Sequence, residues 1–346
     1  MRKFLFFMGI RQVAVVVLLF IASSLFAATL SGIADSGIIL GDANDDGSVN
    51  VNDITTIATY ILNGKASPWN EKNADANADG IINVNDITAT ANIILSKPIE
   101  EKKTITVNGV SFTMIRVEGG TFQMGATPEQ MGMDDEERPV HSVTLSSYYI
   151  AETEVTQALW EAVTGYKPTK DSYQWKAPYG VGAQYPAYYV SWNDCQDFIA
   201  KLNSLTGEKF RMPTEAEWEY AARGGNKSKG YRYSGSNTIG DVAWYKGNAF
   251  DMGKNNPNYG THAVKTKQPN ELGLYDMTGN LSEWCNDWYG TYSSNPQTNP
   301  TGPADGTNRI VRGGHWGAPE KNSGVAYRKY PSPNSRTRQD GLRLAM

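Results

Sequence analysis

The sequence predicts an α+β protein of two units: a small all-α module built on two calcium loop–helix repeats, and a larger domain with low regular secondary structure. Three observations predict this. A twelve-residue pattern rich in Asp and Asn occurs at residues 42–53 and again at 75–86. An apolar stripe of helical period follows each copy. Residues 107–346 are rich in Gly, Trp and Tyr, and their Gly and Pro positions favour short strands and long loops.

The composition argues against several classes of function. The chain has 346 residues and a formal net charge of -4, so it has no overall basic field for binding nucleic acid. Three His and two Cys argue against a zinc enzyme and against a disulfide-stapled scaffold. The acidity is concentrated in residues 41–97, where eight acids face three bases.

Residues 1–27 predict a signal peptide that directs export. Arg2, Lys3 and Arg11 precede an apolar run at residues 13–26, and Ala27 and Ala28 follow it. The run is shorter than the ~20 residues that a helix needs to cross a bilayer core, so no retained membrane span is expected. We therefore expect a secreted or cell-surface protein, with a periplasmic location as the alternative.

Each twelve-residue copy has the pattern of a calcium loop. Oxygen-bearing side chains occupy positions 1, 3, 5, 9 and 12, and glycine occupies position 6, where such a loop turns sharply. Ca²⁺ takes about six to eight oxygen ligands, which this spacing supplies. The expected ligands are Asp42, Asn44, Asp46, the carbonyl of Ser48 and Asp53 in the first loop, and Asp75, Asn77, Asp79, the carbonyl of Ile81 and Asp86 in the second. The alternative is a pair of polar surface turns that bind nothing.

One amphipathic helix is expected after each loop, over residues 54–62 and 87–95. The helix that precedes the loop in a full EF-hand is missing, because residues 37–40 and 69–72 are too short to supply it. These features of residues 41–97 resemble the type I dockerin family, whose modules bind cohesin domains in extracellular polysaccharide-degrading complexes.

The dockerin resemblance also implies the partner-binding residues. In that family, loop positions 10 and 11 help to select the cohesin; here they are Val51 and Asn52, then Val84 and Asn85. The two pairs are identical, which implies a pseudo-symmetric module that binds in either orientation. The pair differs from the Ser-Thr of the best-known dockerins, so the sequence does not identify which cohesin is the partner. The alternative is that the Val side chains pack and the Asn side chains are solvated.

A linker is expected at residues 98–106, followed by the large domain at 107–346. Helices are predicted over residues 157–163, 192–205 and 214–223, and the last has Thr214 as N-cap with acids in its first turn. Eight motifs resemble the formylglycine-generating enzyme, or sulfatase-modifying factor, family: GGTFQMG at 119–125, ERPVH at 137–141, EVT at 154–156, VSW at 190–192, RMPTEAEWEYAARGG at 211–225, GLYDMTGNLSEW at 273–284, VRGGHW at 311–316 and GLRLA at 341–345. The resemblance implies an elaborated C-type-lectin-like fold.

Enzymatic members of that family oxidise a sulfatase cysteine with a copper ion held by two cysteines after the Arg-Gly-Gly motif. Counted from that motif, those positions fall near Ala318 and Ser323 here, and no cysteine follows Cys285. Copper(I) needs soft thiolate ligands, so no copper and no formylglycine-generating activity are expected. Cys195 and Cys285 are either a disulfide in an exported protein or two buried thiols.

The resemblance implies a structural calcium site in the large domain as well. Asp276, Gly279, Leu281 and Glu283 match it, with two carboxylates and two carbonyls as ligands. The alternative is that Asp276 is a loop carboxylate and Glu283 a packed acid.

A ligand site is expected near the C-terminus. Residues 309–346 contain eight Lys or Arg against two acids, and arginine suits sulfate and carboxylate groups. The candidate ligand-binding residues are His315, Trp316, Tyr327, Arg328 and Tyr330. The alternative is that Arg312 and Arg343 form buried structural pairs while the other bases are solvated. Trp288, Tyr289 and Tyr292 are further candidates for stacking on sugars.

The predicted function is that of a secreted protein that docks through calcium to a cohesin-type partner. Its large domain would bind a glycan or protein in polysaccharide degradation without catalysis. Two alternatives stay open: an enzyme that performs sulfatase modification or another reaction on the same fold, and a purely structural adaptor.

Overall fold

The computed structural model describes residues 38–96, 100–130, 135–168 and 173–346, so the predicted signal peptide lies outside the described residues. The chain divides into two compact units, residues 1–99 and 100–346. No described helix has the length and apolar character needed to cross a membrane.

The described residues of the small unit form the helices α2 (Val51–Asn63), α3 (Glu71–Ala74) and α4 (Val84–Ser96). Asn50 caps α2 in a capping box with Asp53, and Gly64 ends the helix in the left-handed conformation that glycine tolerates. The centre of the unit is Ala43, Ile57 and Ala74. The predicted apolar stripes are only partly buried, because Leu62 and Leu95 remain 70% and 67% exposed.

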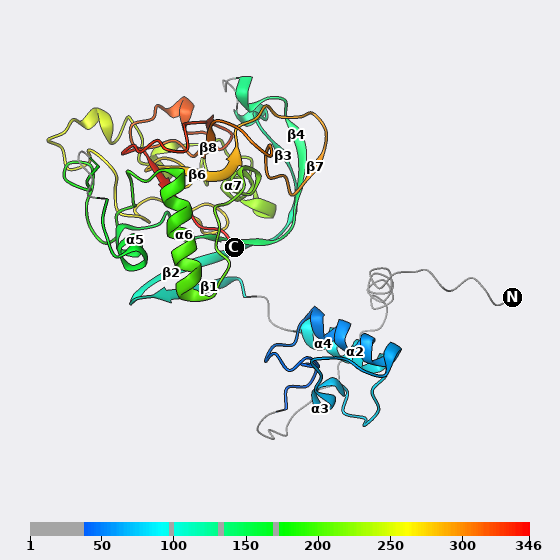
Figure 1. Ribbon diagram of the computed structural model, residues 1–346. Helices are drawn as coiled ribbons and strands as arrows, with labels where there is room; N and C mark the ends of the chain where they lie inside the picture. Colours follow the sequence, from blue (N-terminus) through cyan, green and yellow to red (C-terminus); the bar gives the residue numbers. More distant parts are fainter. Residues whose placement is uncertain (1–37, 97–99, 131–134, 169–172) are drawn as a thin grey trace. The chain divides into compact units, whose positions relative to one another are not determined.

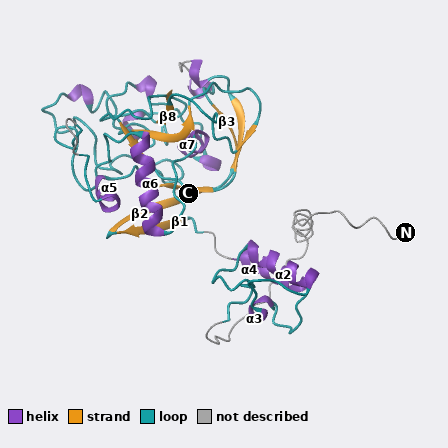
Figure 2. Ribbon diagram, viewed as in Figure 1, coloured by secondary structure: helices purple, strands orange, loops and turns teal. Residues whose placement is uncertain are grey.

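The described part of the large unit forms three small sheets joined by long loops (Figure 2). The first has the order β1-β2-β5, the second β3-β4-β7 and the third β10-β6-β8-β9. The strands are β1 (Lys102–Val107), β2 (Val110–Val117), β3 (Gly120–Met124), β4 (His141–Leu145), β5 (Tyr148–Ala151), β6 (Ser282–Trp288), β7 (Gln297–Thr298), β8 (Arg309–Arg312), β9 (Arg328–Lys329) and β10 (Asp340–Leu342).

The segment predicted as a linker at residues 98–106 is largely strand. β1 begins at Lys102 and pairs antiparallel with β2 along its whole length. Exposed and half-buried side chains alternate along β1 as far as Thr106, and Val107 at its end is buried. The charged residues Lys102 and Lys103 therefore lie on a strand with one face toward solvent. A strand of this kind accommodates charged side chains on its solvent face.

Among its described residues, four α-helices and five short 3-10 turns accompany the sheets of the large unit. The α-helices are α5 (Gln157–Thr164), α6 (Trp192–Thr206), α7 (Glu215–Ala222) and α8 (Ile239–Val242), and the turns are η2 (Pro128–Gln130), η3 (Asp135–Glu137), η4 (Gly225–Lys227), η5 (Phe250–Met252) and η6 (Glu320–Asn322). The three predicted helices are confirmed, and Thr214 forms a capping box with Glu217 at the start of α7. Every residue of α7 is buried, so this helix is the centre of the unit.

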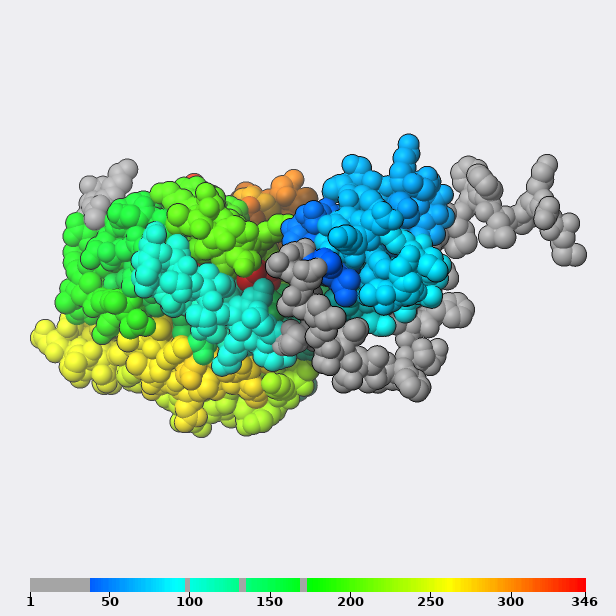
Figure 3. Space-filling view, turned by 90° about the horizontal axis from the view of Figure 1, so that it is seen from below, coloured from blue at the N-terminus to red at the C-terminus, as the bar shows by residue number. Residues whose placement is uncertain are grey.

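The C-terminal residues of the large unit pair with the edge of its first sheet. Ala345 bridges both Ile150 of β5 and Arg211. In Figure 1, α6 extends from the β1–β2 hairpin toward β6 and β8, and Figure 3 shows β1–β2 (cyan) beside the α5–α6 region (green). The two larger apolar clusters of the described interior contain, first, Trp160, Phe198, Trp284 and Trp316 and, second, Ile150, Trp218 and Tyr220. A smaller cluster contains Tyr233, Ile239, Val242 and Ala243.

Candidate functional site

The first twelve-residue loop folds around two aspartates. Asp42 accepts the backbone N–H groups of Asp46 and Gly47 at 3.1 and 3.0 Å. Asp53 accepts those of Asn44 and Asn50 at 3.1 and 2.7 Å. Gly47 has a φ of 84°, which the sharp turn at position 6 requires.

The second loop repeats these contacts with the same spacing. Asp75 accepts the N–H groups of Asp79 and Gly80 at 3.0 and 2.8 Å. Asp86 accepts those of Asn77 and Asn83 at 3.3 and 2.8 Å. The duplicated sequence therefore folds into a duplicated geometry.

Three carboxylates of these loops are buried without a basic partner. Asp42, Asp53 and Asp86 are at most 1% exposed, and no ion pair among the described residues involves them. A buried carboxylate needs a compensating positive charge, and a cation at the loop centre would supply it. No described group of three or more His, Cys, Asp or Glu could hold a metal by itself. A cation here would also need the amide and carbonyl oxygens of the loops.

The helices that follow the loops present matching apolar surfaces. Val51 and Val84 are 64% and 62% exposed, and Leu62 and Leu95 follow each valine eleven residues later. Asn52 and Asn85 are also exposed. The duplication places two equivalent surfaces on the small unit.

The large unit buries part of the expected C-terminal ligand site. Trp316 is fully buried and packs on Tyr259 with ring centroids 5.0 Å apart. Its indole N–H donates to the carbonyl of Arg338 at 3.0 Å. The expectation that Trp316 contacts a ligand directly is therefore wrong, because the ring belongs to the apolar core.

The other aromatic candidates are half-buried. Tyr327 accepts a hydrogen bond from Asn322 at 2.8 Å, and Tyr330 stacks on Tyr289 with ring centroids 3.8 Å apart. His315 accepts the N–H of Gly317 at 3.1 Å. Burial and the charge of Lys329 lower the pKa of His315 to about 3, so this ring is neutral at physiological pH.

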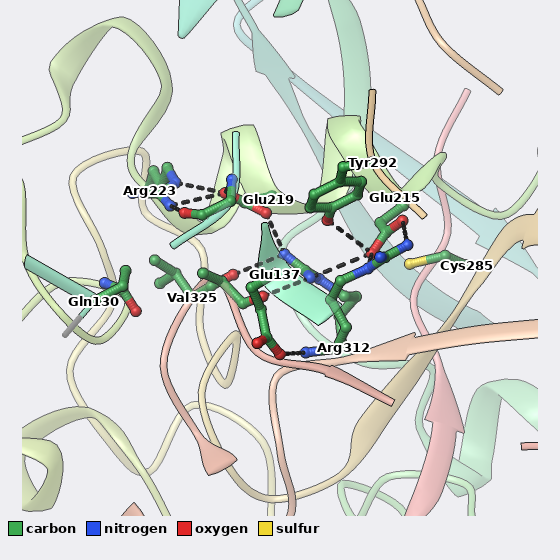
Figure 4. A network of polar contacts seen from close by, with 12 residues as sticks. Gln130, Glu137, Glu215, Glu219, Arg223, Cys285, Tyr292, Arg312 and Val325 are labelled. Atoms are coloured by element: carbon green, nitrogen blue, oxygen red, sulfur yellow. Dashed lines mark hydrogen bonds and ion pairs between the residues drawn. The ribbon is translucent and has the colours of Figure 1, made fainter. Parts of the chain in front are cut away.

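Arg328 is held by a buried ionic network with Glu215. Figure 4 shows this network around Glu215, Glu219 and Arg312. Its guanidinium donates to both oxygens of Glu215, at 2.5 and 2.8 Å. Arg312 donates to Glu215 at 3.3 Å and to Glu219 at 2.5 Å. Arg223 also donates to Glu219, at 2.8 Å. Burial by itself would raise the pKa of Glu215, but Arg328 and Arg312 bring it below its ordinary value.

These contacts correct the expectation of a free basic end. Arg343 donates to Glu283, and Arg336 pairs with Asp194. Arg309 lies between the rings of Trp192 and Trp288, 3.8 and 3.4 Å from their centroids. The alternative of structural pairs describes Arg312 and Arg343, because both are fully buried.

The expected calcium site of the large domain contains an additional carboxylate. Glu283 accepts three bonds from Arg343, at 3.0, 2.8 and 2.7 Å, and one from the indole of Trp218, at 2.6 Å. Asp276 accepts the N–H of Lys265 at 2.9 Å. Glu154, which the sequence analysis did not select, accepts the N–H of Leu281 at 3.0 Å. The EVT motif was the available signal for it.

This cluster holds more carboxyl groups than basic groups. Glu154, Asp276 and Glu283 are at most 3% exposed, and Arg343 is the fully buried base among them. Burial raises the pKa of Glu154 well above its ordinary value, and the charges of Asp276 and Glu283 raise it further. Burial also raises the pKa of Asp276 to about 6.

Two observations concern the cysteines and the expected copper positions. Cys195 and Cys285 are buried free thiols, so they form no disulfide. Ala318 and Ser323, near which the family resemblance places the copper-binding cysteines, are 3% and 0% exposed. Ser323 donates to the carbonyl of Pro319 at 3.2 Å.

Comparisons with known proteins match both units. Residues 101–346 match the family model of the sulfatase-modifying factor enzyme 1-like domain, and residues 40–95 match the dockerin type I domain. A protein named chaperone protein LppX from Paenibacillus barcinonensis is 32% identical, over 68% of this chain and 89% of its own. The formylglycine-generating enzyme of Streptomyces coelicolor is 29% identical, over 67% of this chain and 88% of its own.

Solved structures also resemble the large unit. Treponema denticola variable protein 1 matches with a TM-score of 0.60 and 32% identity, over 72% of this chain and 99% of its own. PvdO from Pseudomonas aeruginosa matches with a TM-score of 0.60 and 28% identity, over the same shares of the two chains.

Proposed function

The chain belongs to the sulfatase-modifying factor family and carries a type I dockerin before that domain, and from this premise we propose a calcium-dependent docking component. A dockerin implies a cohesin partner, and type I dockerins bind calcium. The proposal adds export through residues 1–27. It also adds a large domain that binds a glycan or protein without oxidase chemistry, in polysaccharide degradation.

The proposed calcium ligands are those of the two duplicated loops. The observation that supports them is the burial of Asp42, Asp53 and Asp86 without a basic partner. Hard carboxylate, amide and carbonyl oxygens suit Ca²⁺. Calcium would supply the missing positive charge and tie each loop to the start of its helix, since Asp53 and Asp86 lie in the first turns of α2 and α4.

The observation that carries the docking proposal is the pair of equivalent exposed surfaces on α2 and α4. Val51–Asn52 and Val84–Asn85 would contact the cohesin in either of two orientations. Calorimetry with a panel of type I cohesins tests this. Val51→Asp or Val84→Asp alone should weaken binding only about twofold, because one of two equivalent modes is lost. The double variant, or EDTA, should abolish binding. A single variant that abolishes binding would refute the two-orientation model.

The non-oxidase part of the proposal rests on Ala318 and Ser323. A methyl group and a hydroxyl cannot replace the thiolates that copper(I) requires, and both side chains are buried. The test is oxidation of a sulfatase-type cysteine peptide with added copper. The Streptomyces coelicolor enzyme serves as the positive control. Turnover by this protein would refute the proposal.

We further propose calcium in the large domain, at Asp276, the carbonyls of Gly279 and Leu281, and Glu283. The supporting observation is that three buried carboxylates face one buried arginine. When ionised they leave two negative charges that a divalent cation would balance. Metal analysis of the full chain separates the possibilities, since two equivalents of calcium would indicate the dockerin alone and three would indicate this site as well.

A further inference from the structure

A cavity of about 500 Å³ lies beside the β3–β4–β7 sheet of the large unit. Its walls come from β4, α7, β6, β9 and the segment at residues 290–303. We call it the Asp287 cavity and define it by His141, Glu215, Asp287, Trp288, Tyr292 and Arg328. Its volume is within the range of ~300–1,000 Å³ that is typical of small-molecule sites.

The charged groups of the wall compensate one another. Arg328 and Glu215 form the two-bond ion pair described above, and Tyr292 donates to Glu215 at 3.2 Å. The guanidinium of Arg328 lies over the ring of Tyr292, 3.9 Å from its centroid. A charged ligand would have to compete with these buried contacts, so the wall offers it no free charge.

Two buried groups keep hydrogen-bonding capacity toward the cavity. Nδ1 of His141 lies 3.1 Å from the carbonyl of Pro139, and a carbonyl can only accept. Nδ1 therefore carries a proton, and in the Nδ1–H tautomer Nε2 is the acceptor. Asp287 is 4% exposed and accepts the N–H of Glu215 through one oxygen at 3.0 Å. Burial raises the pKa of Asp287 to about 8, so at pH 7 it is an acid with a proton to donate.

The segment at residues 290–303 covers Asp287 closely. Gly302 has a φ of 73°, and a Cβ there would lie 2.9 Å from Cβ of Asp287. Glycine therefore permits the segment to pass directly beside the carboxyl. The same segment supplies uncharged hydrogen-bonding side chains to the cavity: Thr291, Ser293, Gln297, Thr298 and Thr301.

We propose that the Asp287 cavity binds a neutral, hydroxyl-rich ligand, such as a sugar unit that is free or at the end of a glycan. Each sugar hydroxyl both donates and accepts, which matches a wall of hydroxyls, an amide, an imidazole acceptor and a protonated acid. Because Arg328 and Glu215 neutralise each other's charge, a sulfated or carboxylated sugar is disfavoured. The inference rests on the proposed binding function and specifies its site and ligand class.

The test is saturation-transfer NMR and calorimetry on the full chain with calcium. Glucose, galactose, mannose and xylose probe a free sugar, cellotetraose and xylotetraose probe a glycan end, and glucuronate and glucose 6-sulfate probe charged ligands. Thr301→Val and His141→Asn should each weaken neutral-sugar binding about fivefold to tenfold, because each removes one hydrogen bond. His141→Asn retains an amide N–H that can donate to Pro139 in place of Nδ1. Thr106→Val, an exposed threonine of β1, is the matched control and should leave binding unchanged.

The outcomes separate the site from the function. Neutral-sugar binding that both variants weaken supports the cavity, and the relative affinities for free sugars and tetrasaccharides identify the natural source. Neutral-sugar binding that neither variant changes refutes the cavity and leaves the binding function in place. Binding of only charged glycans or of a protein refutes the ligand class. No binding of any glycan or protein refutes both proposals.

Discussion

Replacement of Arg312 by methionine should strongly destabilise the large unit. Arg312 is fully buried and bridges Glu215 and Glu219. It also donates to the carbonyls of Val325 and Ala326 at 2.9 and 2.8 Å. Methionine has a similar length but no donors, so it leaves two carbonyls without these bonds and two buried carboxylates short of one positive charge.

The expected cost is about 3–5 kcal/mol, the usual loss when one partner of a buried ion pair is removed. The two carbonyls add to this, but the terms are not additive, because Arg223 and Arg328 still contact the two glutamates. Arg312→Lys should cost less than methionine, since an ammonium keeps the charge but cannot reproduce the fork of donors.

Urea unfolding followed by tryptophan fluorescence measures the effect, because every tryptophan except Trp69 lies in the large unit. The matched control is Arg336→Met. Arg336 pairs with Asp194 through two bonds of 2.7 Å, but the side chains are 39% and 23% exposed. An exposed pair contributes at most about 1 kcal/mol. An Arg312→Met cost no larger than that of the control would refute the argument that burial makes this network essential.

Three further predictions concern metal, pH and sulfur. Asp42→Ala should remove one calcium equivalent and leave the second loop loaded, which metal analysis of the purified chain measures; loss of both ions would show that the loops are not independent. Burial raises the pKa of Asp287 to about 8, with Glu215 and Glu217 adding to the rise and Arg328 opposing it, against about 3.9 in an unfolded chain. Between these values the folded state holds a proton that the unfolded state has released, so this contribution to stability is complete below about pH 4 and is lost as the pH rises to about 8. Asp287→Asn should therefore raise the melting temperature more at pH 8 than at pH 4.5, and an equal change at both would contradict the assignment. Burial raises the pKa values of Cys195 and Cys285 well above the ordinary thiol range, so a thiol reagent should label both only after unfolding; rapid labelling of the native protein would contradict this.

Much of the small unit was predictable because its functional groups are neighbours in the sequence. A twelve-residue loop draws all its ligands from one stretch of chain, and the glycine at position 6 and the polar cap at the helix start are local choices. The caps of α6 and α7 follow the same logic: Ser191 bonds Asp194, and Thr214 bonds Glu217, each three residues away. These local signals can be recognised in the sequence without any knowledge of the tertiary fold.

The large unit was predictable in its family and its helices but not in the roles of its side chains. Arg328 looked like a ligand-binding cation, yet its partner Glu215 lies 113 residues away. Trp316 looked like a stacking surface, yet the fold buries it completely. No periodic pattern in the sequence indicates the contacts of Arg328 or Trp316, because these contacts form only when segments far apart in the chain pack together.

The sequence by itself determined the two-unit organisation, the duplicated loops, the main helices and the absence of any cysteine after Cys285. Only the tertiary structure decided which charges are neutralised, that Glu154 joins Asp276 and Glu283, that the two cysteines stay apart, and that His141 and Asp287 share a cavity wall. The physical reason is range: caps and loop ligands act over a few residues, whereas burial and ion pairing depend on the whole packed interior.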